Sequence, residues 1–370
     1  MKATPLQSRH EALGAKMTEF AGYLMPLVYS SIREEHLGVR DNVGIFDVSH
    51  MGEFIIKGKE ALALVQKVTS NDASKLKIGE AQYSCLPNKR GGIVDDLLVY
   101  RLDEDQCAEG EQVFMLVVNA ANIEKDFNWI ASYNEFNTRL IDISEQTGLL
   151  AIQGPQATAF LQPFTAITLE KLTYYTFAKT TFAGCHNVLI SATGYTGSGG
   201  FEIYAENKDI ERIWDAIFEK YTPDEMIPAG LGARDTLRLE MGYCLYGNDI
   251  DDTTSPLEAG LGWITKIKKG PFVSKEIFAK QKAEGIVRRL VGFTIDDRRV
   301  PRHGYQIEDE AGNSIGVVTS GTFAPSLETS IGMGYVKTPF SKDGTLIYIA
   351  TGRKKLKGTV TKLPFLKLNE

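Results

Sequence analysis

The chain has few cysteines and no long apolar run. No two of its cysteines form a Cys-x-x-Cys pair, so neither a zinc site nor a redox dithiol is indicated. Buried free thiols are the expected state of Cys85, Cys107, Cys185 and Cys244. No stretch of about 18 apolar residues occurs, and the first residues contain no apolar signal segment. We therefore expect a cytoplasmic protein that has no metal and does not enter a membrane.

The sequence also lacks a strong excess of one charge. Lys and Arg total 41 against 47 for Asp and Glu, and this net charge of −6 argues against a surface that binds nucleic acid. A hydrophobic content of 43% excludes a disordered chain, and 370 residues can bury more than one core. The charge is uneven, since residues 266–370 carry 19 basic and 10 acidic side chains. We expect the two parts of the molecule to face different partners.

Helical and extended patterns mix without the strict alternation typical of a parallel sheet. Residues 31–34 match a capping box, and apolar residues, with His36 among them, follow at helical spacing. The extended runs 81–86 and 93–100 flank a turn-forming segment at 88–92, which predicts a hairpin. These patterns indicate an α+β fold with antiparallel sheets.

The C-terminal part differs from the rest of the chain. Beyond about residue 285, short β-rich runs are separated by turns rich in Gly, Pro and Asp. We therefore predict a separate β-barrel or β-sandwich over residues 281–370, and a main region over residues 1–280. The charged, helix-compatible segment 266–284 connects the two.

Two adjacent aspartates interrupt an apolar strand pattern at residues 91–100. Because side chains alternate along a strand, Asp95 and Asp96 point to opposite faces, and at least one lies among apolar neighbours. An ionised carboxylate there is costly unless it is paired, hydrogen-bonded or used. A structural role with loop amides and a functional role are both compatible with this pattern.

Two further segments contain residues suited to chemistry. The glycine-rich segment 194–204 does not match a dinucleotide fingerprint, but it offers a close backbone approach, with Tyr195 on one side and Glu202 in the succeeding strand; an ordinary hairpin is the alternative. Residues 228–240 place Arg234 and Arg238 four apart in a helical segment. A solvated, salt-bridged face is one interpretation. The other is an Arg held rigidly to recognise a carboxylate or a planar heterocycle.

Several segments together resemble the T-protein family of the glycine cleavage system, the tetrahydrofolate-dependent aminomethyltransferases. The matching segments occur in the family's order from about residue 4 to residue 365. They lie at 46–52, 91–96, 118–122, 152–155, 194–197, 232–238, 245–249, 320–325 and 332–336. The resemblance implies a three-lobed, cloverleaf-like molecule with two interleaved α+β lobes and a C-terminal β-barrel.

The resemblance also implies a function and a site. T-proteins transfer the methylene of the aminomethyl group on the lipoyl arm of H-protein to tetrahydrofolate, and release ammonia and dihydrolipoyl H-protein. Asp96 corresponds to the family's essential carboxylate, and Glu202 and Arg234 correspond to folate contacts. The residues that fall where the family lines its folate channel are Tyr83, Met51, Tyr100, Asn119 and Tyr195.

The family relation predicts partners as well. Lipoylated H-protein is the direct partner, and the P-protein and L-protein of the same system act indirectly. A basic surface could attract H-protein or the folate tail, although a merely solvated face is the alternative. Its candidate residues are Lys266, Lys268, Lys269, Arg353, Lys354, Lys355 and Lys357.

Two other functions are compatible with a folate-binding chain. The folate domains of demethylating dehydrogenases accompany a flavin domain, for which this sequence has no dinucleotide fingerprint. Folate-binding modules related to iron–sulfur assembly factors carry a Lys-Gly-Cys-Tyr type of motif, which is absent from this sequence. The second of these, without transferase activity, is the main alternative to the aminomethyltransferase.

Overall fold

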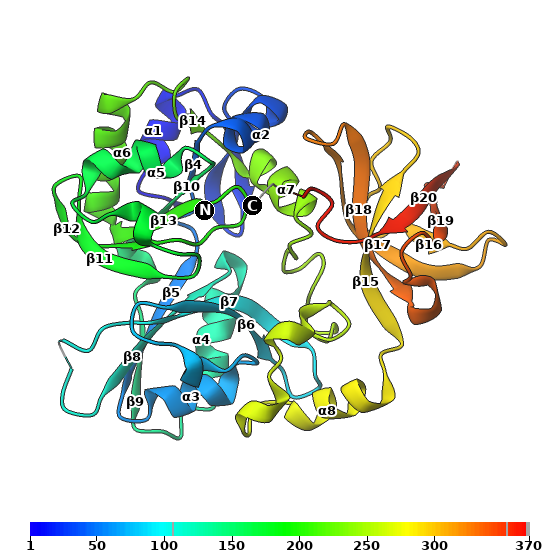
Figure 1. The fold of residues 1–370 in the computed structure, drawn as a ribbon, viewed down its shortest axis with the longest axis horizontal. Coiled ribbons are helices and arrows are strands. Elements are labelled where there is room, and N and C mark those ends of the chain that lie inside the picture. The colour runs from blue at the N-terminus through cyan, green and yellow to red at the C-terminus, as the bar shows by residue number, and fades with distance from the viewer. Residues whose placement is uncertain (106, 353, 368–370) are drawn as a thin grey trace. The chain divides into compact units, whose positions relative to one another are not determined.

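The computed structural model describes residues 1–105, 107–352 and 354–367 (Figure 1). The chain divides into two compact units. The first unit comprises Met1–Val68, Asp72–Tyr83 and Leu97–Arg234. The second unit comprises Thr69–Asn71, Ser84–Asp96 and Asp235–Glu370. Each unit therefore contains segments that are far apart in the sequence.

A six-stranded sheet forms one half of the first unit. Its strands, in spatial order, are β11 (Phe177–Phe182), β12 (Cys185–Ser191), β13 (Gly200–Glu206), β10 (Thr147–Gln153), β4 (Gly44–Asp47) and β14 (Ile227–Pro228). Neighbouring strands are antiparallel except β4 and β14, which are parallel. Four helices of the first unit accompany this sheet: α1 (Gln7–Ala12), α2 (Ile32–Asp41), α5 (Ala157–Leu161) and α6 (Asn207–Lys220).

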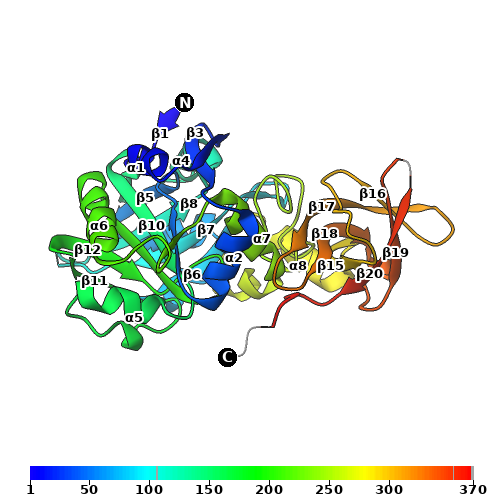
Figure 2. The same cartoon turned by 90° about the horizontal axis from the view of Figure 1, so that it is seen from above.

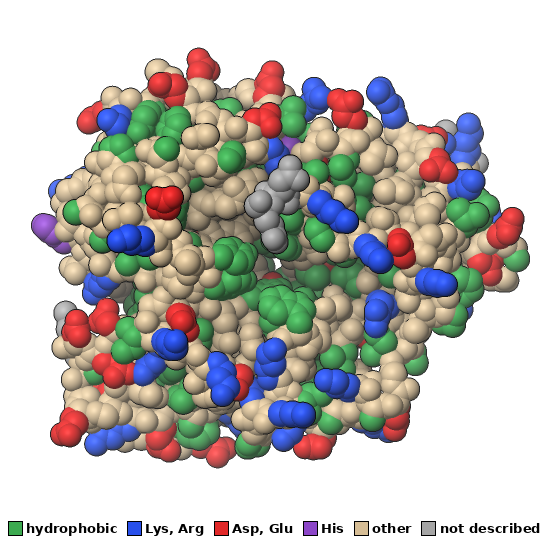
Figure 3. Space-filling view, in the orientation of Figure 1, with side chains coloured by type: hydrophobic (Ala, Val, Ile, Leu, Met, Phe, Trp, Pro, Cys, Tyr) green, Lys and Arg blue, Asp and Glu red, His purple; other side chains and the backbone are tan. Residues whose placement is uncertain are grey.

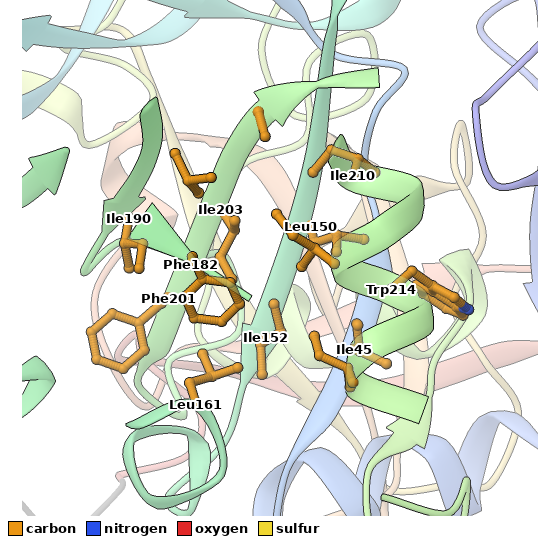
Figure 4. Close-up of a cluster of buried hydrophobic side chains, with 14 of the residues drawn as sticks. Ile45, Leu150, Ile152, Leu161, Phe182, Ile190, Phe201, Ile203, Ile210 and Trp214 are labelled. Carbon is orange, nitrogen blue, oxygen red and sulfur yellow. The ribbon is translucent and has the colours of Figure 1, made fainter. Parts of the chain in front are cut away.

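One face of this sheet is covered by a large apolar core (Figure 4). Phe201 and Ile203 of β13 pack in this core with Leu150 of β10 and with Ile210 and Trp214 of α6. Because side chains alternate along β13, Glu202 and Tyr204 point to the opposite face. The core therefore fixes β13 and presents two polar side chains on the sheet's other side.

A five-stranded sheet accompanies the six-stranded one. Its strands, in spatial order, are β6 (Ala81–Pro87), β7 (Ile93–Arg101), β8 (Gln112–Val118), β5 (Gly52–Gly58) and β9 (Thr138–Asp142). The helices next to it are α3 (Ala61–Val68) and α4 (Ile123–Ala131). A small third sheet contains β1 (Lys2–Ala3), β3 (Tyr23–Val28) and β2 (Lys16–Phe20). Strands of the five-stranded sheet lie between β4 and β10 in the sequence, so the two larger sheets are interleaved along the chain.

The second unit contains a closed six-stranded barrel (Figure 2). The helix α8 (Lys275–Glu284) precedes it, and α7 (Leu231–Glu240) crosses from the first unit into the second. The strands around the barrel are β15 (Arg288–Ile295), β18 (Thr329–Lys337), β17 (Ser314–Ala324), β16 (Gln306–Glu308), β19 (Leu346–Ala350) and β20 (Lys355–Thr361). Its interior is filled by apolar side chains such as Phe293, Val318 and Ile349.

The predicted fold class is confirmed. The structure is α+β, its two larger sheets are interleaved along the chain and mainly antiparallel, and the tail is a closed barrel. Helix α2 begins where the capping box predicts, with the Ser31 side chain accepting from the Glu34 N–H. All four cysteines are free, but Cys107 is half-buried rather than buried. The three-lobed outline and the boundary at residues 280 and 281 stay predictions.

Candidate functional site

A group of hydroxyls surrounds the Glu202 carboxyl on the face of β13 away from the core. Glu202 Oε2 accepts a hydrogen bond from Thr193 Oγ1 at 2.5 Å and from the Tyr204 hydroxyl at 3.4 Å. The Tyr100 hydroxyl of β7 lies 3.1 Å from that of Tyr204 and 3.2 Å from Thr193 Oγ1. Burial raises the pKa of Glu202, while the Thr193 hydrogen bond and the positive charge of Arg234 act in the opposite direction.

Arg234 lies at the start of α7, with its guanidinium over an aromatic ring. Its guanidinium carbon is 4.7 Å from the centroid of the Tyr195 ring, a cation–π distance. Glu35 of α2 holds the start of α7, because its Oε2 accepts a hydrogen bond from the Gly230 N–H at 2.8 Å. A negative side chain at a helix N-terminus is favourable. Glu35 therefore fixes the turn from which Arg234 projects.

The glycine-rich segment is the loop between β12 and β13. These strands are antiparallel neighbours, so the segment forms the hairpin that was the alternative interpretation. Buried Gln153 orders its loop by donating to the Thr193 carbonyl at 3.1 Å and accepting from Thr196 Oγ1 at 2.9 Å. A Cβ on Gly194 would lie 1.9 Å from Gln153 Oε1, so only glycine allows this approach. The hairpin thus also places Tyr195 beside Arg234.

His50 is a neighbour of this group that sequence reasoning did not single out. Its side chain is buried, and the rings of Phe20 and Tyr23 pack edge-on against it. Burial and the positive charge of Arg234 lower the pKa of His50 to about 4, with Asp47 acting in the opposite direction. His50 is therefore neutral at neutral pH and leaves Arg234 as the positive charge of the group.

Asp95 and Asp96 point to opposite faces of β7, as alternation predicts. Asp95 is fully buried, and Asp96 is half-buried. Asp96 belongs to the second unit, where burial and its negative charge raise the pKa of the Cys85 thiol. Along the strand Asp96 shares its face with Leu98 and Tyr100.

Met51 and Asn119 come to the same end of the five-stranded sheet. The pair Gly52 and Val118 closes the register between β5 and β8, and Met51 and Asn119 flank it. Both side chains are half-buried, as is that of Tyr83 on β6. The contacts of the first unit thus connect Glu202, Arg234, Tyr195 and Tyr100, while ligand roles for Met51, Asn119, Tyr83 and Asp96 stay predictions.

Arg238 does not lie on a solvated face. It is buried and donates to Asp249 Oδ2 at 2.7 Å, to Ser320 Oγ at 3.0 Å and to Asp235 Oδ1 at 2.8 Å. The solvated interpretation is therefore wrong for this residue. Asp235 is in α7 itself, Asp249 is in the turn at 247–249 and Ser320 is in β17, so these contacts lock the end of α7 to β17.

The sequence offered only a weak signal for Thr193, Tyr204 and His50. His50 lies in the matching segment 46–52, Thr193 precedes the glycine-rich segment 194–204, and Tyr204 follows Glu202 at the spacing of one strand face. Among the described residues, no group of three or more His, Cys, Asp or Glu is placed to hold a metal ion. The assembled group can accept hydrogen bonds through a carboxylate, donate them through a guanidinium, and stack a flat ring.

Comparisons with known proteins identify the family. A model of the GCVT N-terminal domain matches residues 6–269, and a model of the glycine cleavage T-protein C-terminal barrel domain matches residues 288–367. The chain belongs to the glycine cleavage T-protein family. The predicted family is confirmed, and so is the predicted function of an aminomethyltransferase in the glycine cleavage system. A folate-binding module without transferase activity is not favoured.

Individual relatives agree with this assignment over the whole chain. A protein of Flavobacterium psychrophilum named aminomethyltransferase is 56% identical and covers 99% of this chain and 100% of its own length. One of Halothermothrix orenii with the same name is 47% identical over the same shares. The crystal structure of glycine cleavage system aminomethyltransferase T from Bartonella henselae matches with a TM-score of 0.91 at 36% identity, covering 99% of this chain and 98% of that one.

Proposed function

We propose that this enzyme transfers the methylene of an aminomethyl group on the lipoyl arm of H-protein to tetrahydrofolate. The carbon–nitrogen and carbon–sulfur bonds of S–CH₂–NH₂ break, and two bonds to folate nitrogens form. The two folate N–H protons pass to the leaving amine and the leaving sulfur. The products are 5,10-methylenetetrahydrofolate, ammonia and dihydrolipoyl H-protein, and the P-protein and L-protein of the same system are indirect partners.

The Glu202 group carries this proposal. A pterin edge presents amide and amino N–H groups, which a buried carboxylate can accept, and a carbonyl oxygen, to which a guanidinium can donate. Glu202 and Arg234 supply these two groups, and the Tyr195 ring supports the guanidinium. The half-buried side chains of Met51, Tyr83 and Asn119 would line the remainder of the folate site, with Tyr100 beside Glu202.

We assign the reacting centre to Asp96. Its carboxylate would orient the folate amine and stabilise the positive charge that develops on the carbon as ammonia leaves. A general-base role of the same carboxylate is the alternative. Asp96 shares a strand face with Tyr100, whose hydroxyl belongs to the Glu202 group. This placement supports a role next to bound folate. Asp95 points to the opposite face and would have no part in the reaction.

The reaction itself is the first test. Purified enzyme is mixed with aminomethyl-loaded H-protein, and ammonia and methylenetetrahydrofolate are measured with and without tetrahydrofolate. We expect tetrahydrofolate to stimulate the release of both products in equal amounts. Folate binding without turnover would contradict the transferase reaction and favour a binding module.

Substitution of each aspartate tests the assignment of the centre. Asp96→Asn should bind tetrahydrofolate like the wild-type enzyme and lose most of its turnover. Asp95→Asn is the matched control on the same strand, and its kcat should fall much less. Unchanged turnover in Asp96→Asn would remove Asp96 from the reaction.

We further propose that the basic C-terminal part attracts H-protein. Lys269 is held by the Thr69 and Asn71 carbonyls at 2.6 and 2.7 Å. The exposed residues of the set are Lys266, Lys268, Lys354, Lys355 and Lys357. Figure 3 shows basic and acidic side chains interspersed over the face in view. Reversal of three of these exposed charges, those of Lys266, Lys268 and Lys357, should raise the KM for H-protein and weaken its salt dependence. Unchanged kinetics would contradict this docking role.

The remaining expectations concern Arg353, membrane crossing, metal and nucleic-acid binding, and the location of the protein. Arg353, one of the predicted basic residues, lies outside the described residues. None of the described helices is long and apolar enough to cross a bilayer. The absence of a metal and of a nucleic-acid partner, and the cytoplasmic location, stay predictions.

A further inference from the structure

Glu53 of β5 differs from the other buried glutamates of the first unit. Its side chain is fully buried, and neither carboxyl oxygen has a hydrogen-bond partner among the described residues. In contrast, Glu35 accepts from three backbone N–H groups, and Glu202 accepts from two hydroxyls. Buried polar groups are normally paired, so an unpaired carboxyl needs an explanation.

The strand register places Glu53 on the sheet face that carries Tyr100. Glu53 and Leu98 both pair directly with Val117, one from each side of β8. Residues directly opposite each other point to the same face, and Tyr100 follows Leu98 by two positions. The Tyr100 hydroxyl in turn lies 3.1 Å from that of Tyr204. Glu53 therefore lies on the face turned toward Glu202.

The opposite face of this sheet has a purely structural partner. Phe54, the next residue on β5, packs edge-on against Phe127 of α4, with ring centroids 5.5 Å apart. A carboxyl on that face would lie beneath a helix and away from Glu202. Glu53 lies near the charge of Glu202 because its position on β5 points to the face that carries Tyr100.

The surroundings of Glu53 and Glu202 push the two carboxyls toward different protonation states. Glu202 has the Arg234 charge and two hydroxyl donors to stabilise its ionised form. Burial raises the pKa of Glu53 well above the usual range, and the negative charges of Asp142 on β9 and Glu202 on β13 raise it further. The tyrosines that sense its charge are Tyr23 of β3 and Tyr204 of β13.

We propose that Glu53 is a positioning residue of the folate site, which stays protonated so that Glu202 is the carboxylate that meets the pterin. This inference rests on the proposed function. Ionisation of Glu53 would place a second negative charge beside Glu202 in a site that water does not reach. The two carboxylates would repel each other and compete for the Thr193 and Tyr204 hydroxyls and the Arg234 charge that hold Glu202, so Glu202 would be displaced from the position in which it accepts hydrogen bonds from folate. Tetrahydrofolate binding therefore weakens when Glu53 loses its proton.

Direct binding across pH tests this role. The dissociation constant of tetrahydrofolate is measured from about pH 6 to about pH 9 for wild-type enzyme and for Glu53→Gln, which keeps the shape and cannot ionise. We expect equal affinities at the acidic end, and an alkaline weakening of up to about tenfold in the wild type that Glu53→Gln lacks. The KM for tetrahydrofolate should follow this pattern while kcat does not.

Two more variants keep the test decisive. Glu53→Leu also removes the titrating group, and its pH profile should be as flat as that of Glu53→Gln even if the glutamine variant folds poorly. Asp142→Asn leaves Glu53 in place and removes a negative charge that raises the pKa of Glu53, so the alkaline weakening should move to lower pH. A move to higher pH would contradict the inference. The same pH profile in wild type, Glu53→Gln and Glu53→Leu would overturn the inference. Absence of tetrahydrofolate binding by the wild type at every pH would instead overturn the proposed function.

Discussion

Arg238 and Asp249 form an ion pair that is enclosed within the second unit. The guanidinium donates to Asp249 Oδ2 at 2.7 Å, and the two side chains are 2% and 0% exposed. Asp249 also accepts from Ser320 Oγ at 2.8 Å and from the Leu245 N–H at 2.9 Å. With its hydrogen bonds satisfied on both sides, this pair joins the end of α7, the turn that follows it and the barrel strand β17.

Removal of one charge from this pair should destabilise the protein strongly. Asp249→Asn leaves the buried Arg238 guanidinium with only the partly exposed Asp235 as a counter-charge, and we expect the free energy of unfolding to fall by about 3–5 kcal/mol. Denaturant unfolding measures this loss. The matched control is Arg299→Ala, which breaks the exposed pair with Asp297 in the same unit and should cost far less stability. Equal effects of the two variants would contradict the role of burial.

Folate affinity should depend on the charge of Glu202 and on the shape of Arg234. Glu202→Gln and Arg234→Lys should each weaken tetrahydrofolate binding by about 10- to 100-fold, because a charged hydrogen bond contributes about 1.5–3 kcal/mol and lysine loses the planar contact with Tyr195. Equilibrium binding gives the result. Arg212→Lys, at an exposed arginine of α6, is the control and should bind folate normally.

Stability should fall in mild acid because of His50. Its pKa is about 4 in the folded protein and about 6.5 in an unfolded chain, so between these values the unfolded state binds more protons. Stability is therefore retained at neutral pH and lost as the pH falls from about 6.5 to about 4, by about 2–3 kcal/mol in total. Denaturant unfolding over this range should show a shallower loss in His50→Gln. The exposed His186 provides the control variant, His186→Gln, whose profile should match the wild type.

A methyl group at position 194 should disturb the loop that carries Tyr195. In Gly194→Ala the new Cβ would lie 1.9 Å from Gln153 Oε1, so the hydrogen bonds of Gln153 to the loop must shift. We expect a loss of about 1–3 kcal/mol in stability and weaker tetrahydrofolate binding. Gly262→Ala is the control, because its Cβ would meet only the end of a flexible leucine side chain at 3.2 Å. Wild-type binding by Gly194→Ala would show that the loop geometry does not matter.

Local chemistry explains which parts of the fold could be predicted from the sequence. The start of α2 depends on Ser31 and Glu34, and the β6–β7 hairpin depends on Asn88, whose side chain accepts from the Gly92 N–H at 3.0 Å. These interactions span three or four residues, so the sequence displays them directly. The barrel was predictable for a similar reason, because its turns separate its strands clearly.

The contacts that sequence analysis missed join residues of distant strands. Tyr100 and Tyr204 are 104 positions apart, and their contact depends on how the two sheets are interleaved. Glu53 carried the same signal as Asp95, an acidic residue in an apolar strand, but its meaning depends on which face it shares with Tyr100. Arg238 was misjudged because helical spacing shows which residues share a face and not what covers that face.

The closed barrel of the second unit affects how this part of the chain unfolds. Each of its six strands has a neighbour on both sides, so no strand in the described barrel presents a free edge of N–H and C=O groups. Strand exchange between copies would have to break two ladders rather than one. Backbone amides from β15 to β20 should therefore exchange with deuterium together and slowly, as one cooperative unit that is lost in a single event.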